Sequence, residues 1–298
     1  VERGQGAEDH LRLCFQDEVS LLVPASKIHL VQKYVGSASG AVLDKLGGKG
    51  FQRRKEQVQE ALFDLAADLL EVQAARARVQ RPPFVADASE RDFQDAFPFR
   101  DTQDQATAWT EIRGDLEKAS PMDRLLCGDV GFGKTEVALR AAFAAVLNGK
   151  QVAVVVPTTL LARQHYKTFS QRFTGLPVKV AQMSRMVASS DLKAAKTGAA
   201  SGEVDIVVGT HAVLGKTVSF KDLGLVVIDE EQHFGVGHKE RLKELRSEVH
   251  VLTLSATPIP RTLQLALTGV RELSIIATPP VDRLAVRTFI TPFDELIV

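Results

Sequence analysis

The chain has 298 residues, 45% of them hydrophobic, and its 37 Lys plus Arg balance its 37 Asp plus Glu. This length and apolar content suit one large or two ordinary globular domains. The balanced charge excludes a global electrostatic attraction to nucleic acid or membrane, so any DNA contact must come from local groups.

No apolar run reaches the roughly 20 residues needed to span a bilayer, and the N-terminus has no signal-peptide pattern. Cys14 and Cys127 are too far apart in sequence to resemble a disulfide framework or a zinc cluster. These features predict a cytoplasmic protein without a membrane partner. The chain begins with Val and stops on an apolar DELIV, which we interpret as a segment of a longer polypeptide.

The first hundred residues predict a small β element followed by a long helix. LRLCFQDEVSLLV, residues 11–23, alternates apolar and polar positions on both sides of a polar centre, as a β-hairpin does. Residues 52–77 instead carry apolar side chains at three- and four-residue steps, which indicates an amphipathic helix. Pro82 and Pro83 end this helix, and the segment RPPFVADASERDFQDAF is expected to be a linker.

From about residue 101 the pattern changes to strands alternating with helices. Short apolar runs predict strands at 124–127, 151–156, 178–183, 204–208, 223–228 and 249–254, with helices at 136–147 and 160–173. This alternation predicts an α/β domain with a parallel sheet covered by helices on both faces. We therefore expect three parts, at 1–36, 37–100 and 101–298.

The motif GDVGFGKT, residues 128–135, lies between a predicted strand and a predicted helix. Gly128, Gly131 and Gly133 would let backbone N–H groups converge on phosphate oxygens at a helix N-terminus. Lys134 would reach the β- and γ-phosphates, and the Thr135 hydroxyl would hold Mg²⁺. The alternative, an ordinary glycine-rich turn, does not explain the Gly-Lys-Thr ending in this context.

A second motif, LGLVVIDEEQ, places acidic residues at the end of an apolar strand. Asp229 would bind the Mg²⁺, directly or more readily through water, and Glu230 is placed to orient and deprotonate an attacking water. Alone, such a cluster would be interpreted as a solvated turn. Together with the phosphate loop it predicts an ATP-hydrolysing site in which Lys134, Asp229 and Glu230 carry the catalysis.

Further segments resemble, in order, the motifs of superfamily-two helicases and translocases, which hydrolyse ATP between two RecA-like lobes. They are PTTLLARQH at 157–165, VGTHAVL at 208–214 and SATPIPRT at 255–262. The resemblance implies a first RecA-like lobe here. It implies DNA-phosphate contacts by Thr158, Arg185, Thr210 and His211, and coupling of nucleotide state to DNA grip by Gln232, Ser255 and Thr257. Singly, Thr and Ser in such loops are usually turn or cap residues.

FPFRDTQDQ, residues 97–105, resembles the adenine-reading segment of the same superfamily. Gln105 stands at the amide position, and Phe97 or Phe99 could stack on a base. An amide can pair with both a donor and an acceptor on the adenine edge, so ATP is the favoured nucleotide. The two Phe side chains could alternatively pack the linker onto the core.

The motor segments and the N-terminal part together resemble the bacterial transcription-repair coupling factors, over about residues 11–289. The resemblance implies an ATP-dependent double-stranded DNA translocase that contacts RNA polymerase through residues 1–84 and displaces it when stalled. UvrA would be a partner of the full-length protein only. RecG-type branch-migration helicases share many motor motifs and remain an alternative, as does a non-enzymatic module that docks polymerase and DNA.

Two features depart from the family pattern. The box here is DEEQHFG, where other members often carry His and then Arg at the positions of Gln232 and His233. Nothing after SAT at 255–257 resembles the second lobe, which supplies an arginine finger worth about 10³- to 10⁵-fold in rate in well-studied phosphoryl-transfer systems. We therefore expect this chain alone to bind ATP weakly and hydrolyse it slowly.

Overall fold

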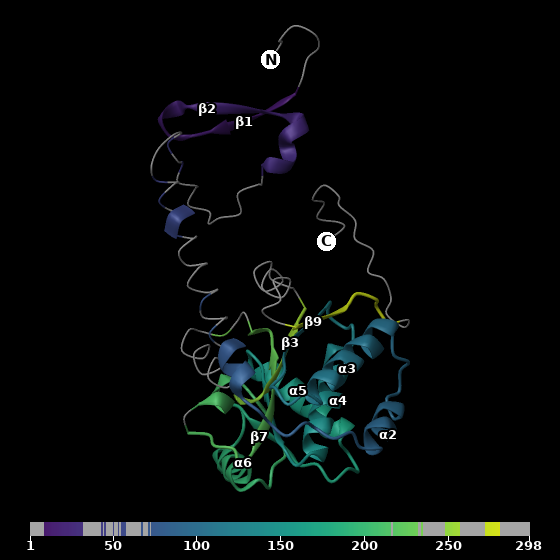
Figure 1. Cartoon of the computed structure of the whole chain (residues 1–298). Helices are drawn as coiled ribbons and strands as arrows, with labels where there is room; N and C mark the ends of the chain where they lie inside the picture. Colours follow the sequence, from purple (N-terminus) through teal and green to yellow (C-terminus); the bar gives the residue numbers. More distant parts are fainter. Residues whose placement is uncertain are drawn as a thin grey trace, which may run out of the picture. The chain divides into compact units, whose positions relative to one another are not determined.

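A computed structural model describes residues 9–31, 79–215, 217–231, 234, 248–256 and 272–280, with scattered residues between 43 and 78 (Figure 1). The chain divides into two compact units, Val1–Asp68 and Leu69–Val298. The boundaries expected at residues 36 and 100 separate parts of the chain with different expected functions, and they stay predictions. Among the described residues, no helix combines the length and the apolar character that crossing a membrane requires.

The first unit contains the expected β-hairpin. Strands β1 (His10–Cys14) and β2 (Ser20–Pro24) pair antiparallel, with Leu13 opposite Leu21. The short helix η1 (Gln16–Glu18) connects them, and η2 (Ala25–Leu30) follows. The prediction from the alternating pattern is therefore confirmed.

The predicted long helix at 52–77 is described only in part. Residues 53, 55–57, 67, 71 and 73–77 are helical. The apolar positions on which the prediction depends lie outside the described residues; they are Val58, Leu62, Leu65, Leu69 and Val72.

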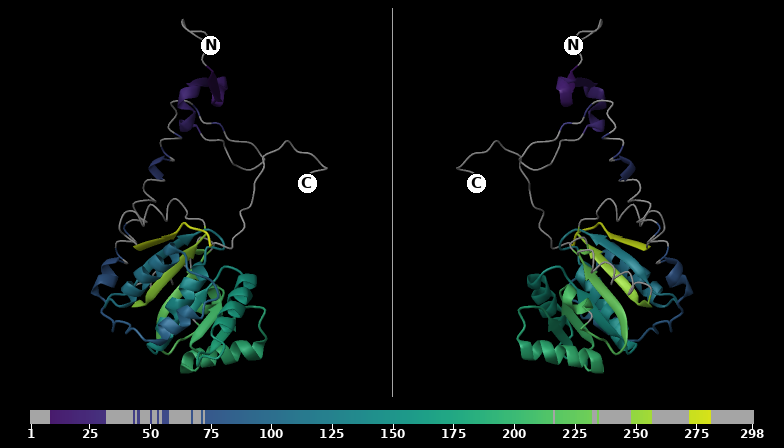
Figure 2. Two further views of the ribbon diagram at one scale, coloured as in Figure 1. Left: turned by 90° about the vertical axis from the view of Figure 1, so that its right-hand side faces the viewer. Right: turned by 90° about the vertical axis from the view of Figure 1, so that its left-hand side faces the viewer.

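The second unit is built on a seven-stranded parallel sheet in the order β5-β6-β4-β7-β8-β3-β9. All six predicted strands are present and a seventh, β9, lies at one edge, in yellow in Figure 2. The strands are β3 (Asp123–Gly128), β4 (Gln151–Val155), β5 (Val180–Met183), β6 (Ile206–Gly209), β7 (Leu223–Asp229), β8 (His250–Ser255) and β9 (Glu272–Ile276).

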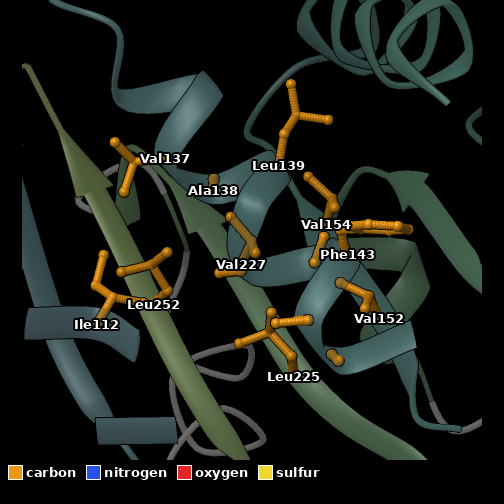
Figure 3. Close-up of a cluster of buried hydrophobic side chains, with 14 of the residues drawn as sticks. Ile112, Val137, Ala138, Leu139, Phe143, Val152, Val154, Leu225, Val227 and Leu252 are labelled. Carbon is orange, nitrogen blue, oxygen red and sulfur yellow. The ribbon is translucent and has the colours of Figure 1, made fainter. Parts of the chain in front are cut away.

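The central strands are apolar along their whole length because both faces of the sheet are covered. Val152 and Val154 of β4 belong to one core cluster, whereas Ala153 and Val155 belong to the other. Successive strand side chains point to opposite faces, so a continuous apolar run fills two cores at once. Figure 3 shows the first cluster, where Phe143 lies beside Val154.

Helices on the first face are α3 (Gln103–Leu116), α4 (Lys134–Leu147) and α5 (Thr159–Arg172), which contribute Ile112, Val137 and Phe169 to that core. Helix α6 (Ser189–Ser201) and η3 (His211–Leu214) contribute Ala199 and Val213 to the other. The expected α/β class with both faces covered is confirmed. Helix α2 (Ser89–Asp95) lies within the segment expected to be a linker, and its Phe93 is buried in the first core.

Candidate nucleotide site

The loop after β3 and the carboxyl ends of β7 and β8 line a cavity of about 740 Å³. Ligands of open parallel sheets bind at this edge, where the connecting loops diverge. Nine residues predicted from the sequence to form the nucleotide site line it: Phe97, Phe99, Gln105, Gly131, Gly133, Lys134, Thr135, Asp229 and Glu230. The structure therefore brings together residues that are up to 133 positions apart in sequence, from Phe97 to Glu230.

Two glycines shape the phosphate loop. Gly131 and Gly133 have φ angles of 81° and 85°, in the left-handed region that favours glycine. At Gly133 a Cβ would also come within 2.2 Å of Gln105 Nε2. Helix α4 begins directly after this turn, at Lys134, so its positive N-terminal end faces the cavity.

Lys134 bends back over the loop. Its Nζ donates to the carbonyl oxygens of Gly128 and of Asp129, the latter at 3.0 Å. Burial lowers the pKa of the Lys134 ammonium, and the carboxylates of Asp229 and Glu230 oppose this shift. Gly128 does not line the cavity; as the last residue of β3 it contributes the carbonyl that orients Lys134.

The acidic pair follows directly from the end of β7. Asp229 is the last residue of that strand, and Glu230 leaves it with a φ of 53°, an unusual conformation for a residue other than glycine. The N–H of Ala256, just after β8, donates to Glu230 Oε1 at 2.9 Å. A residue other than glycine with a left-handed backbone conformation, fixed by such a hydrogen bond, is typical of a functional site.

The donor set fits a magnesium–nucleotide complex. The Thr135 hydroxyl and the Asp229 carboxylate line the same cavity, and Mg²⁺ is usually held by one or two carboxylates plus substrate phosphates. In the described part of the chain no group of three or more His, Cys, Asp or Glu residues could hold a metal by itself. Thr135 and Asp229 both line the cavity, and their predicted role in holding Mg²⁺ stays a prediction.

The expected base-binding segment forms one wall of the cavity. The rings of Phe97 and Phe99 contact edge to face with centroids 5.5 Å apart, and Phe99 is largely exposed. Gln105 is buried: its Oε1 accepts from the Thr102 N–H at 2.9 Å and its Nε2 donates to the Phe132 carbonyl at 2.9 Å. The amide thus joins the start of α3 to the phosphate loop, and its predicted reading of adenine stays a prediction.

A buried ionic network holds this wall. Arg140 of α4 makes a bidentate contact with Asp101 at 2.6 and 2.9 Å, and its Nε donates to Glu136 at 3.1 Å. Arg172 of α5 shares the Glu136 carboxylate and lies 3.8 Å from the centre of the Phe93 ring. These contacts connect the base segment to α4 and α5.

The residues predicted to contact DNA lie after the strands in the other half of the sheet. Thr158 follows β4, Arg185 follows β5, and Thr210 and His211 follow β6. Arg185 is exposed and His211 half-buried. The Thr158 hydroxyl caps α5 by accepting from the Leu161 N–H at 3.2 Å, and Thr210 is buried. DNA contact by these four residues stays a prediction.

The coupling residues are only partly described. Ser255 is the last residue of β8, buried and aligned with Cys127 of β3. Gln232, His233 and Thr257 lie outside the described residues.

Sequence reasoning missed one complete side of the cavity. Helix α5 contributes Leu161, Gln164, His165 and Thr168, at steps that place them on one helix face. The sequence predicted a helix at 160–173, but the motif at 157–165 within and before it was assigned to DNA contact and not to the nucleotide cavity. Arg100 and Pro280 are further lining residues that were not predicted.

The chain belongs to the DEAD/DEAH box helicase family, whose model matches residues 102–266. It is also similar over its whole length to transcription-repair-coupling factors, at 48% identity over 300 aligned residues to that of Escherichia coli (strain K12) and 47% over 293 to that of Bacillus subtilis (strain 168). The alignments cover 100% and 98% of this chain but 26% and 25% of those relatives. The chain thus spans about a quarter of their length.

A solved structure of RecG bound to a three-way DNA junction is also similar. It is 33% identical with a TM-score of 0.68, and the match covers 86% of this chain and 35% of that one. The resemblance to coupling factors, inferred from the motifs, is confirmed by these comparisons, and the helicase fold agrees with the α/β sheet.

Proposed function

We propose that this chain is the first motor lobe of an ATP-dependent double-stranded DNA translocase that acts in transcription-coupled repair. The observation that supports this most directly is the single cavity lined by Lys134, Thr135, Asp229 and Glu230. These side chains are of the types that bind the phosphates, hold the metal and orient the nucleophile in phosphoryl transfer from ATP.

Each residue has a proposed role set by its position. The N–H groups of the phosphate loop and the Lys134 ammonium bind the phosphates, and Thr135 and Asp229 hold Mg²⁺, which neutralises charge on the phosphates when bound. Glu230 orients the attacking water and accepts its proton. The hydrogen bond that the Ala256 N–H donates to Glu230 would link this base to the segment after β8.

DNA would bind across the neighbouring half of the same sheet edge. Arg185 and His211 are the accessible members of the predicted DNA set. We further propose that the longer protein engages stalled RNA polymerase, displaces it and recruits UvrA. A chain with a single lobe should hydrolyse ATP slowly, since the arginine finger comes from the second lobe in the family.

A measurement of the equilibrium affinity for ATP tests whether Lys134 binds the phosphates. Lys134→Ala removes a charged donor to the phosphates, and such bonds contribute about 1.5–3 kcal/mol, or roughly 10- to 150-fold in affinity. Isothermal titration with ATP and Mg²⁺ should show that loss, and Lys193→Ala on the exposed part of α6 is the matched control. Equal affinity of wild type and Lys134→Ala would contradict the assignment.

A RecG-like branch-migration helicase is the second candidate, favoured by the similarity to the RecG structure. Co-elution with purified bacterial RNA polymerase separates the two. The sequence assigned this contact to residues 1–84, but Arg76, Arg81 and Phe84 contact the sheet of the second unit, so the deletion should end at residue 68.

Polymerase binding that is lost in the shortened chain would support the coupling-factor function. Absence of binding by the intact chain, with DNA stimulation selective for forks, would favour the RecG-like function. Circular dichroism of both chains checks that each is folded.

A further inference from the structure

His165 makes a direct contact with the carboxylate expected to hold magnesium. Its Nε2 lies 3.0 Å from Oδ2 of Asp229, although the two residues are on different elements, α5 and β7. An ionised carboxylate can only accept hydrogen bonds, so the imidazole donates from Nε2. The contact therefore also sets which tautomer a neutral His165 adopts.

The imidazole is held in place by its surroundings. His165 is 8% exposed, and its ring lies 6.4 Å from that of Phe169, a fully buried residue one turn further along α5. Gln164 and Thr168 of the same helix line the cavity with it. A buried ring on a rigid helix is suited to fixing the orientation of its partner.

We propose that His165 is a positioning residue for Asp229. By donating to Oδ2, it holds the Asp229 carboxylate in one orientation, in which that carboxylate would help to hold the metal of a bound ATP complex. Residues that hydrogen-bond to metal ligands in this way typically change metal affinity or activity by about 10- to 100-fold when removed. The inference rests on the proposed function, because it requires Asp229 to be a magnesium ligand.

Two substitutions separate positioning from packing. His165→Leu fills the space without a donor, whereas His165→Gln keeps an N–H that can reach the carboxylate. Lys167→Ala, on the exposed side of α5, is the control. ATP affinity is measured by isothermal titration in Mg²⁺ and in EDTA, and Mn²⁺ binding in the presence of ATP is measured by electron paramagnetic resonance.

His165→Leu should lower both the Mg²⁺-dependent ATP affinity and the Mn²⁺ affinity by about tenfold or more. Its affinity in EDTA should match wild type, His165→Gln should recover most of the loss, and Lys167→Ala should show none. Thermal melting in the absence of ligand identifies any variant that fails to fold.

Unchanged Mn²⁺ affinity in a folded His165→Leu chain would overturn the positioning role, as would equal losses in the Leu and Gln variants. A wild-type chain that binds ATP no better with Mg²⁺ than in EDTA would instead contradict the proposed function at its metal. The two failures are distinguished by the wild-type measurement alone.

Discussion

The two ends of the parallel sheet both carry buried polar groups, but they present them differently. At the amino end, His250 begins β8 fully buried, and its Nδ1 accepts from the Met122 N–H at 2.9 Å. Phe84 lies against its ring at 4.8 Å, and Arg81 donates to the Glu248 carbonyl at 2.6 Å. At the carboxyl end, the charged side chains of the candidate nucleotide site line an open cavity.

The difference lies in what covers the polar groups. At the amino end, the segment 76–84 closes the sheet by binding main-chain carbonyls, and Arg76 also pairs with Asp123 at 3.0 Å. At the carboxyl end, the Lys134 ammonium has protein carbonyls as partners but also faces the cavity. Substitutions at the first end should therefore change stability, and those at the second should change ligand binding and turnover.

The largest effect is expected for Glu230→Gln in a chain completed with its second lobe. Loss of a general base lowers the rate by about 10²- to 10⁴-fold, while the neutral isostere preserves the cavity. Phosphate-release kinetics should show that loss, and nucleotide titration should show unchanged ATP affinity. Retained turnover would show that Glu230 is not the general base.

Substitutions of Phe84, at the amino end of the sheet, and of Phe99, which lines the cavity, compare the two ends directly. Phe84→Ala should lower the free energy of unfolding by about 3–5 kcal/mol, because the ring is buried in the core. Phe99→Ala should barely change it, since that ring is 58% exposed, but should weaken ATP binding. Urea unfolding and ATP titration of both variants provide the comparison, and the reverse pattern would contradict it.

Low pH should lower the free energy of unfolding because His250, at the amino end of the sheet, is buried. Burial, with help from Arg81 and Arg76, lowers the pKa of this imidazole from 6.5 to about 3. Between these values the unfolded chain binds a proton that the folded chain does not, so stability is lost as pH falls from about 6.5 toward about 3. At pH 5 this corresponds to about 2 kcal/mol.

His250→Asn tests this assignment, because its side-chain oxygen can still accept from the Met122 N–H but does not titrate. Urea unfolding at pH 8 and pH 5 should show a pH-dependent loss smaller by about 2 kcal/mol in the variant, since other groups titrate in both chains. The same loss in both chains would show that His250 does not carry it.

The smallest effect concerns the predicted DNA surface. Arg185→Ala should weaken duplex binding uniformly across sequences and reduce the slope of log affinity against log salt by about 1. Arg91→Ala, on the exposed side of α2, is the control and should leave the slope unchanged. Fluorescence anisotropy with two unrelated duplexes measures both, and an unchanged slope for Arg185→Ala would remove it from the DNA surface.

Local patterns predicted much of this fold. The hairpin follows from period-two alternation, and six of the strands follow from continuous apolar runs that are buried on both faces. Strand β9, at an edge of the sheet, was missed because Glu272 and Ser274 interrupt its apolar run. Helix α3 was also missed, although Thr102 and Gln105 form a capping box that was readable in the sequence.

The sequence by itself determined which residues form the phosphate-loop motif and the Asp229–Glu230 pair, because residue types at fixed local spacing define those motifs. Only the tertiary structure decided that Gln105 binds the phosphate loop and that His165 contacts Asp229. Both contacts join residues distant in sequence, and parallel strands linked by crossover helices bring such residues together at one sheet edge. Local spacing does not show which side chains from distant parts of the sequence will contact each other at that edge of the sheet.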